Sequence, residues 1–337
     1  MRSARQPLAL TMGEPSGISG EIVIKAWKAE DGGPVPPFVY IGDPSWLRAE
    51  AHQLHSHVHV IEVSSPAEAI TRFSDGIPVL TEHLPERPQY GKPSAANASA
   101  VVASIRRAVE MTREGSCSAV VTGPIHKAAL YSSGFGFPGH TEFLAELTGS
   151  TSPVMMLSIE GLRVVPVTVH LPLAAAIASL SAARIASTTA ILARALRDDF
   201  GIEQPRIAIA ALNPHAGESG TLGREEIEII QPAIEELQAA GLQAIGPLPA
   251  DTLFHAAARA GFDAVVCMYH DQALIPLKTL DFHRGVNTTL GLPIVRTSPD
   301  HGTALDIAGK GLADPSSLLA AMRLADRMAR TRAGEQS

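Results

Sequence analysis

Short apolar runs alternate along this chain with longer amphipathic stretches, and the alternation limits the folds open to it. The runs are bounded by Gly or Pro, a pattern typical of buried strands in a largely parallel sheet. They occupy residues 8–12, 38–41, 58–63, 119–122, 154–159, 164–169, 206–212, 264–268 and 294–297. Apolar positions recur at helical spacing in residues 98–109, 184–200 and 224–237. The sequence therefore predicts an α/β fold.

A length of 337 residues allows one large or two medium domains. No internal repeat or low-complexity linker stands out. Gly/Pro-rich segments near residues 123–124 and 291–293 are the best candidates for crossings between domains. We predict a first α/β domain of residues 1–125 plus 300–337. A second α/β domain, residues 126–299, then carries most of the metal and substrate residues.

The charge balance argues against two classes of partner. A formal net charge of -7 is at odds with a nucleic-acid or membrane-surface footprint, because both need clustered Lys and Arg. No run of apolar residues is long enough for a membrane span. The cysteines, Cys117 and Cys267, lie in or beside hydrophobic runs, which predicts buried thiols and fits a reducing cytosol. We expect a cytoplasmic protein that meets anionic substrates with a local cationic cluster.

Polar groups are unusually dense between residues 268 and 304. Residues 268–272 read Met-Tyr-His-Asp-Gln, and residues 297–304 read Thr-Ser-Pro-Asp-His-Gly-Thr-Ala. Between them lie Lys278, Asn287 and Arg296, which offer an ammonium, an amide and a guanidinium. This combination suits a phosphate or a carboxylate, although surface salt bridges are the alternative for the two cations. Core packing does not require such a density of polar groups, so the segment predicts an active site.

Three histidines each follow an apolar strand: His170, His215 and His270. The ends of parallel strands are where ligands bind, and three imidazoles can hold one divalent ion while leaving open positions. Taken singly, each is more typical of a hydrogen-bonded structural histidine. Taken together, they favour a metal site. A further group, His52, His55, His57 and His59, is interpreted as a solvated loop and edge strand.

Three other features allow a structural and a functional interpretation. His140 and Thr141 open a helical run, where Thr141 is either the N-cap or, with His140, an anion contact. Asp251 also begins a helical run, as an N-cap or as a metal or substrate contact. Residues 134–139 read Gly-Phe-Gly-Phe-Pro-Gly, a spacing like a dinucleotide fingerprint. No strand precedes them and a proline interrupts them, so a surface turn is favoured.

Taken together, several motifs resemble the 4-hydroxythreonine-4-phosphate dehydrogenase family of pyridoxine biosynthesis. They are residues 13–18 (Gly-Glu-Pro-Ser-Gly-Ile), 122–127 (Thr-Gly-Pro-Ile-His-Lys), 139–142 (Gly-His-Thr-Glu), 213–218 (Asn-Pro-His-Ala-Gly-Glu) and 268–309. The resemblance runs essentially end to end. It implies two α/β/α domains of the isocitrate/isopropylmalate dehydrogenase type with the active site in the interdomain cleft. It also implies a homodimer whose metal site draws on both subunits.

The resemblance also implies roles for single residues. It places His170, His215 and His270 as metal ligands, with His170 and His215 from one subunit and His270 from its partner. It places His140, Thr141, Lys278, Asn287 and Arg296 as substrate contacts. NAD or NADP and one divalent ion per site, zinc, magnesium or cobalt, are the implied cofactors. This chain departs from the family at Glu14 and at residues 19–20 (Ser-Gly), where the family often has Asp and Gly-Pro.

The implied reaction oxidises 4-phosphohydroxy-L-threonine to 2-amino-3-oxo-4-phosphooxybutanoate, which decarboxylates to 3-amino-2-oxopropyl phosphate. Asp251 and Lys278 are the candidates for the group that accepts the first proton. Three alternatives stay open. The substrate is a related four-carbon sugar-acid phosphate, such as threonate or erythronate 4-phosphate; the protein is a metal-dependent phosphohydrolase; or it is a non-catalytic sugar-phosphate sensor.

Overall fold

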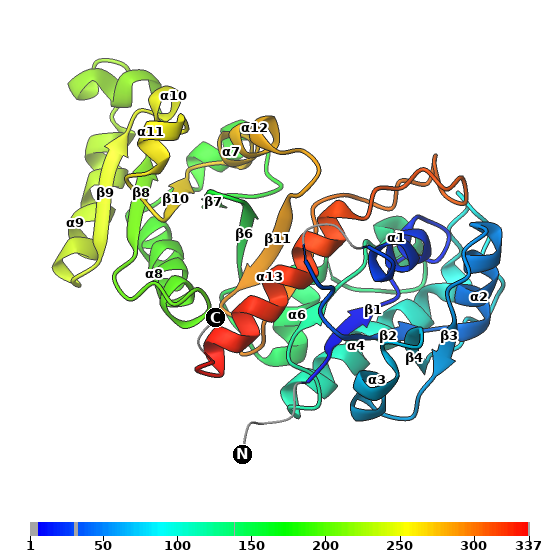
Figure 1. The fold of residues 1–337 in the computed structure, drawn as a ribbon. Coiled ribbons are helices and arrows are strands. Elements are labelled where there is room, and N and C mark those ends of the chain that lie inside the picture. The colour runs from blue at the N-terminus through cyan, green and yellow to red at the C-terminus, as the bar shows by residue number, and fades with distance from the viewer. Residues whose placement is uncertain (1–5, 30–32, 138, 336–337) are drawn as a thin grey trace. The chain divides into compact units, whose positions relative to one another are not determined.

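The chain folds into two compact units, shown in Figure 1 for a computed structural model that describes residues 6–29, 33–137 and 139–335. The first unit comprises Met1–Pro153 and Leu292–Arg330, and the second comprises Val154–Gly291 and Thr331–Ser337. The domain boundaries expected from the sequence lie elsewhere, so that residues 126–153 and 292–299 join the first unit. Strand pairing explains part of the difference, because the strand beginning at Arg296 pairs in parallel with residues 120–121 of the first unit.

The first unit is built on six parallel strands in the order β3-β4-β2-β1-β5-β12. Their bounds are β1 Leu8–Thr11, β2 Phe38–Gly42, β3 Val60–Glu62, β4 Ile77–Thr81, β5 Val120–Val121 and β12 Arg296–Pro299. Strands β1 and β2 are buried along their whole length, as expected of strands covered on both faces. Figure 1 shows α1 (Ser19–Trp27) and α2 (Pro44–Gln53) on one side, with α3 (Pro66–Arg72) and α4 (Ala98–Arg113) on the other.

The helices that follow β5 complete the first unit. They are α5 (Lys127–Ser132) and α6 (His140–Thr148), with the 3-10 turn η1 (Ala95–Asn97) ahead of α4. Helix α13 (Ser316–Arg332) begins in this unit. Buried apolar side chains of α4, among them Val101 and Ile105, recur at the spacing seen in the sequence.

The second unit contains six strands in the order β11-β6-β7-β10-β8-β9. Their bounds are β6 Val154–Ile159, β7 Leu162–Pro166, β8 Arg206–Ala210, β9 Gln243–Leu248, β10 Ala264–Cys267 and β11 Val286–Leu290. Strands β7, β10, β8 and β9 are parallel, whereas β6 is antiparallel to both of its neighbours. The predicted α/β class is confirmed, with a mixed strand arrangement in this unit.

Two apolar cores cover opposite faces of the second unit's strands. Val165 packs with α8 (Ala182–Asp198) and α9 (Gln231–Ala239), while its neighbour Val164 packs with α12 (His270–Leu280). Successive strand residues point to opposite faces, which explains the division. The remaining helices are α7 (Leu173–Ala178), α10 (Ala250–Leu253) and α11 (Ala256–Arg259), with η2 (Pro214–Gly220) and the π-helical turn η3 (Glu226–Ile230) before α9.

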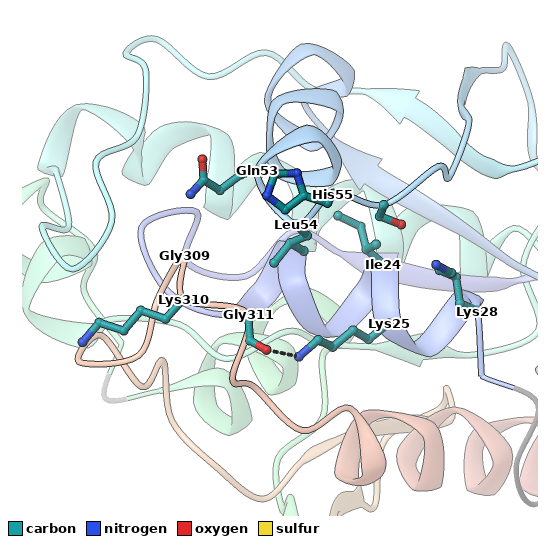
Figure 2. Close-up of a pocket in the computed structure, with 10 residues that line it drawn as sticks. Ile24, Lys25, Lys28, Gln53, Leu54, His55, Gly309, Lys310 and Gly311 are labelled. Atoms are coloured by element: carbon teal, nitrogen blue, oxygen red, sulfur yellow. Dashed lines mark hydrogen bonds between the residues drawn. The ribbon is translucent and has the colours of Figure 1, made fainter.

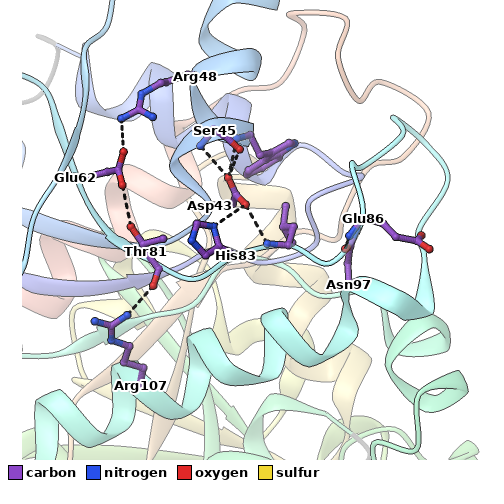
Figure 3. A network of polar contacts seen from close by, with 11 residues as sticks. Asp43, Ser45, Arg48, Glu62, Thr81, His83, Glu86, Asn97 and Arg107 are labelled. Atoms are coloured by element: carbon purple, nitrogen blue, oxygen red, sulfur yellow. Dashed lines mark hydrogen bonds and ion pairs between the residues drawn. The ribbon is translucent and has the colours of Figure 1, made fainter.

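The side chain of Asp43 fixes the start of helix α2 in the first unit (Figure 3). Asp43 precedes α2 and accepts hydrogen bonds from the backbone N–H groups of Ser45, Trp46 and Leu84. Burial alone raises the pKa of Asp43, but hydrogen bonds to the carboxylate, first from the Ser45 hydroxyl and then from these backbone groups, outweigh it and lower the pKa. Such a cap satisfies helix N–H groups that have no partner within the helix. Within the part of the chain that the structure describes, no helix has the length and apolar character needed to cross a membrane.

Candidate functional site

The three predicted metal-ligand histidines follow three neighbouring strands of the second unit. His170 follows β7, His270 begins α12 just after β10, and His215 lies in η2 after β8. Strand β10 pairs in parallel with both β7 and β8, so the carboxyl ends of all three strands lie at one edge. Ligand sites of parallel α/β sheets form at this edge.

His170 and His270 lie close together within one chain. Their ring centroids are 6.1 Å apart. Nδ1 of His270 lies 2.7 Å from Oδ1 of Asp271, a contact that orients the ring and leaves Nε2 for another partner. The two histidines line a cavity of about 300 Å³, together with Thr168, Tyr269 and side chains of α7. The geometry therefore offers two imidazoles to one small space.

Gln272 ties the strand ends together. Its Oε1 accepts a hydrogen bond from Met268 N at 2.7 Å, and its Nε2 donates to Ala211 O at 2.7 Å. Met268 follows β10 and Ala211 follows β8, so this buried amide joins the segments that lead to His270 and to His215. In the sequence Gln272 belongs to the polar stretch 268–272, and nothing in that pattern indicates this role.

His215 lies in a left-handed turn. Residues 215–219 have φ values of 51°, 54°, 77°, 42° and 57°, and only Gly217 among them is a glycine. Each of the other four residues is strained by roughly 1 to 2 kcal/mol in this conformation. A run of this kind persists only where surrounding contacts hold it, and such strain is concentrated at functional sites.

The described residues do not bring all three histidines into one ligand set. Among residues 6–29, 33–137 and 139–335, no group of three or more His, Cys, Asp or Glu side chains is arranged to hold a metal ion. A single chain therefore presents the His170–His270 pair, and His215 lies in the separate turn η2.

A buried cation lies in the first unit at the start of β12. Arg296 is 2% exposed and donates a hydrogen bond from Nη2 to Thr122 Oγ1 at 2.5 Å. Burial lowers the pKa of Arg296 to about 9, so the guanidinium still carries its charge at neutral pH. A desolvated guanidinium attracts a phosphate or carboxylate more strongly than one in water.

His140, the first residue of α6, adds to this cationic region. Burial, with further contributions from the charges of Arg296 and Lys127, holds the pKa of His140 well below its usual value, so the ring is neutral. Its Nε2 atom is buried and has no hydrogen-bond partner among the described residues. Lys127 begins α5, and its Nζ lies 3.5 Å from where a Cβ on Gly139 would stand. Lys127 belongs to the motif of residues 122–127, and the sequence pattern alone does not predict its place in this region.

Two predicted caps differ from the structure. Gly139 precedes α6, so Thr141 lies in the first turn and is not the N-cap. Pro249 likewise precedes α10, which leaves Asp251 exposed within that short helix. Both helices start earlier than their polar residues indicated. The functional interpretations of Thr141 and Asp251 therefore no longer compete with a capping role.

The other predicted substrate residues, Lys278 and Asn287, lie on either side of the loop between α12 and β11. Lys278 is in the last turn of α12, with Nζ 5.7 Å from the centroid of the Phe282 ring. Asn287 pairs with Leu157 of β6, and its Oδ1 is buried with no hydrogen-bond partner among the described residues. A buried, unsatisfied amide oxygen is costly unless a ligand supplies a donor.

Two glycine-containing loops, residues 134–139 and the loop after β1, differ in whether their structure is that of a ligand-binding loop. Of residues 134–139, residue 138 lies outside the described residues, and the stretch follows helix α5 rather than a strand. No strand–turn–helix fingerprint for a dinucleotide is formed there. After β1, by contrast, Glu14 is buried and accepts a hydrogen bond from Ser16 N at 2.9 Å. Burial raises the pKa of Glu14, opposed by that bond and by the charge of His126.

A second hollow, of about 420 Å³, lies where α1 and α2 end (Figure 2). Lys25, Lys28 and Lys310 line it. The ammonium of Lys25 bonds Glu21 Oε1 at 2.8 Å, Gly311 O at 2.9 Å and Ala313 O at 2.7 Å. Cations near helix C-termini offset the helix dipole, and Lys25 here fastens α1 to residues 311–313. We interpret this hollow as structural.

Comparison with known proteins places these features in context. The profile of the family described as "Pyridoxal phosphate biosynthetic protein PdxA" matches residues 35–325. The 4-hydroxythreonine-4-phosphate dehydrogenase of Caulobacter vibrioides is 53% identical over 335 residues, which cover 97% of this chain and 98% of that protein.

Solved structures show the same similarity. The crystal structure of 4-hydroxythreonine-4-phosphate dehydrogenase from Klebsiella pneumoniae superposes with a TM-score of 0.86 at 39% identity, covering 96% of this chain and 99% of that one. A terephthalate 1,2-cis-dihydrodiol dehydrogenase from Burkholderia xenovorans gives a TM-score of 0.65 at 32% identity, covering 96% and 98% of the two chains.

Proposed function

Because the chain belongs to the PdxA family of pyridoxal phosphate biosynthetic proteins, we propose that it is an oxidoreductase of that pathway, a 4-hydroxythreonine-4-phosphate dehydrogenase. It oxidises 4-phosphohydroxy-L-threonine with NAD or NADP to 2-amino-3-oxo-4-phosphooxybutanoate, which loses carbon dioxide to give 3-amino-2-oxopropyl phosphate. The observation that carries this proposal is the 53% identity to such a dehydrogenase across 97% of the chain.

In this proposal the buried cation of the first unit binds an anionic group of the substrate. Arg296 supplies a planar, desolvated guanidinium, held in place by Thr122. His140 and Thr141 sit at the start of α6, where helix N–H groups favour an anion, and Lys127 adds a second positive charge. A neutral His140 can donate or accept a hydrogen bond at Nε2 without repelling Arg296. Lys278 and Asn287 are proposed as further substrate contacts.

The donor set of the second unit fits a divalent metal ion. His170 and His270 offer two imidazoles whose ring centroids are 6.1 Å apart, and Asp271 orients His270. Imidazole nitrogens suit zinc or cobalt better than magnesium, which prefers oxygen ligands. A bound ion would act as a Lewis acid that lowers the pKa of the substrate hydroxyl and stabilises the negative charge of decarboxylation. Asp251 and Lys278 remain the proposed acceptors of the hydroxyl proton.

We further propose that the protein is a homodimer in which each metal site takes ligands from both subunits. Among the described residues of one chain, no third His, Cys, Asp or Glu side chain joins the His170–His270 pair as a possible metal ligand. A closed two-fold dimer has two equivalent sites, and each would receive one histidine from the partner subunit. The division that we propose follows the family resemblance and not this proximity within one chain: His170 and His215 come from one subunit and His270 from its partner.

A substrate screen tests the function. The purified protein, loaded with zinc or cobalt, is given 4-phosphohydroxy-L-threonine, threonate 4-phosphate or erythronate 4-phosphate with each nicotinamide cofactor. We expect the highest kcat/KM, from the absorbance of the reduced cofactor, with 4-phosphohydroxy-L-threonine, and carbon dioxide release equal to cofactor reduction. Faster oxidation of a sugar-acid phosphate would overturn the substrate assignment. Phosphate release without cofactor reduction would indicate a phosphohydrolase, and binding without turnover a sensor.

A further inference from the structure

Glu226 is a buried carboxylate that satisfies the segment leading to His215. It is 3% exposed and begins the π-helical turn η3 ahead of α9. Its Oε1 accepts hydrogen bonds from Leu212 N at 2.8 Å and Asn213 N at 2.7 Å. Its Oε2 accepts one from Asn213 Nδ2 at 2.9 Å. One carboxylate thus accepts three hydrogen bonds from Leu212 and Asn213, which lie between β8 and the turn η2.

The same carboxylate also contacts the interior of the left-handed turn. A Cβ on Gly217 would stand 2.7 Å from Glu226 Oε2, so the carboxylate is seated directly against the backbone of that glycine. The loop that closes the turn approaches Asn213 as well, since a Cβ on Gly223 would stand 2.3 Å from Asn213 Nδ2. Only glycine permits both approaches. Glu226 therefore holds the entry of the turn through Asn213 and its middle at Gly217.

These contacts bear on His215 because of where it lies. It is two residues after Asn213 and two before Gly217, in a backbone conformation that non-glycine residues rarely adopt. Hydrogen bonds to a charged acceptor are stronger than those between neutral groups, and three of them converge where the chain enters the strained run. Without Glu226, the strained residues can relax from positive φ to an ordinary backbone conformation. The imidazole of His215 then moves with them.

We propose that Glu226 is a positioning residue that sets the affinity of the site for a divalent metal ion, by holding the turn that presents His215. The inference rests on the proposed function, in which His215 is a metal ligand. Glu226 itself does not touch the ion. π-Helical turns such as η3 occur frequently at functional sites, and here the turn begins with the residue that contacts the ligand-bearing loop.

The test measures Co²⁺ binding by the full-length protein, using the visible absorption of the ion and a competing chelator. Glu226→Ala removes all three acceptor contacts, and we expect Co²⁺ affinity to fall by about 10- to 100-fold, the range seen when groups that orient ligands are lost. Glu226→Gln keeps one acceptor oxygen but faces Asn213 Nδ2 with a donor, so a smaller loss of at least about 3-fold is expected. Glu228→Gln is the matched control, because Glu228 lies in the same turn and pairs with Arg224 on the surface.

Two further measurements distinguish a positioning role of Glu226 from a general effect on the stability of the fold. Binding is compared at a temperature where circular dichroism shows every variant folded, and Glu226→Gln is repeated in a His215→Ala background at Co²⁺ concentrations high enough to load the weakened site. If Glu226 acts through His215, the second change has no further effect on Co²⁺ affinity there. An equal loss in both backgrounds, or affinity within about 2-fold of wild type in folded Glu226→Ala, overturns the proposal. Should Glu226→Ala not fold, unchanged affinity in Glu226→Gln overturns it.

The proposed function can fail separately. If His215→Ala leaves Co²⁺ affinity unchanged, His215 is not a metal ligand and the metal assignment itself is wrong. If His215→Ala abolishes binding while both Glu226 variants bind like wild type, only the positioning role of Glu226 is rejected.

Discussion

Arg296 and Thr122 form a buried side-chain hydrogen bond, Nη2 to Oγ1 at 2.5 Å, that joins the start of β12 to the residue following β5. Both residues lie in the first unit, where β12 and β5 are parallel neighbours. Thr122 is fully buried, so the guanidinium is held against a rigid strand end. A guanidinium fixed in this way has already lost its side-chain freedom. Binding a phosphate or carboxylate therefore costs little further conformational entropy.

Replacing Arg296 by lysine tests whether this group reads the phosphate. An ammonium cannot reproduce bidentate contact, so KM for 4-phosphohydroxy-L-threonine should rise by about 10- to 100-fold, as expected for loss of a charged hydrogen bond. Steady-state kinetics on phosphorylated and dephosphorylated substrate measure the effect, and the dephosphorylated compound should lose little. Arg48→Lys, at a surface pair with Glu62, is the control. Equal penalties on both substrates would show that Arg296 does not contact the phosphate.

The lowered pKa of His140 predicts a pH dependence of stability. The unfolded chain takes up a proton at this residue below about pH 6.5, whereas the folded chain resists it. The folded state therefore loses stability as pH falls below that value, by up to about 1.4 kcal/mol per pH unit. Urea unfolding at about pH 7.5 and about pH 5.5 should show a larger loss for wild type than for His140→Asn. Identical losses in the two proteins would contradict a neutral, desolvated His140.

Loss of His215 should remove the metal without unfolding the protein. A catalytic ion with open positions adds less to stability than a closed structural site, and His215 lies exposed on its turn. We expect His215→Ala to retain the circular dichroism spectrum of the wild type. Its metal content should fall below about a tenth of the wild-type value, and it should no longer oxidise the substrate. Metal content by atomic emission and cofactor reduction are the measurements, with His57→Ala as a control on an exposed loop. Normal turnover in His215→Ala would reject the ligand role.

Part of this arrangement was accessible from the sequence. Apolar runs ending in histidine place imidazoles at the carboxyl edge of parallel strands, and His170 and His270 do lie together because β7 and β10 are neighbours. The conformation around His215 was not accessible, since a run of left-handed, mostly non-glycine residues contradicts local propensity. It depends on tertiary contacts, chiefly to the side chain of Glu226, fourteen residues beyond Leu212 in the chain.

Two strands that the sequence pattern does not predict, β9 and β11, depend on pairing with neighbouring strands. Strand β9 carries Gly246 and Pro247, which ordinarily argue against a strand, but it lies at the edge of the sheet where proline is tolerated. Strand β11 contains Asn287 and two threonines that read as a loop until β6 pairs beside them. The run predicted at residues 294–297, by contrast, does form a strand, β12, and only its place beside β5 depends on a long-range contact that local composition does not report.

The departure at residues 19–20 has a packing consequence at Gly20. A Cβ there would stand 2.7 Å from Trp46 Cη2 and 3.1 Å from Glu50 Cγ. Gly20→Ala should gain about 1 kcal/mol of helix propensity but lose roughly 1 to 3 kcal/mol to overpacking, because Trp46 is itself buried. We therefore expect a lower Tm by differential scanning fluorimetry. Gly136→Ala is the control, since a Cβ there meets open space. A rise in Tm would mean that the indole shifts freely.

Subunit mixing tests the shared metal site, and two mixtures distinguish two ligand divisions. In the first, inactive His170→Ala is mixed with inactive His270→Ala under conditions that exchange subunits. If His170 and the partner subunit's His270 meet at one site, each heterodimer collects both lesions at one site and keeps the other intact. With random pairing, half of the dimers then have one active site of two, and activity recovers to about a quarter of wild type.

The second mixture, His170→Ala with His215→Ala, gives the opposite outcome for that division, because each site of the heterodimer keeps one lesion. His170 and His270 lie close together within one chain, so a site that uses this pair must also be tested. If that pair binds an ion together with the partner subunit's His215, the second mixture recovers about a quarter of wild-type activity and the first does not. No recovery in either mixture, with exchange confirmed by native mass spectrometry, means that all three ligands come from one chain. The proposed division predicts recovery in the first mixture alone.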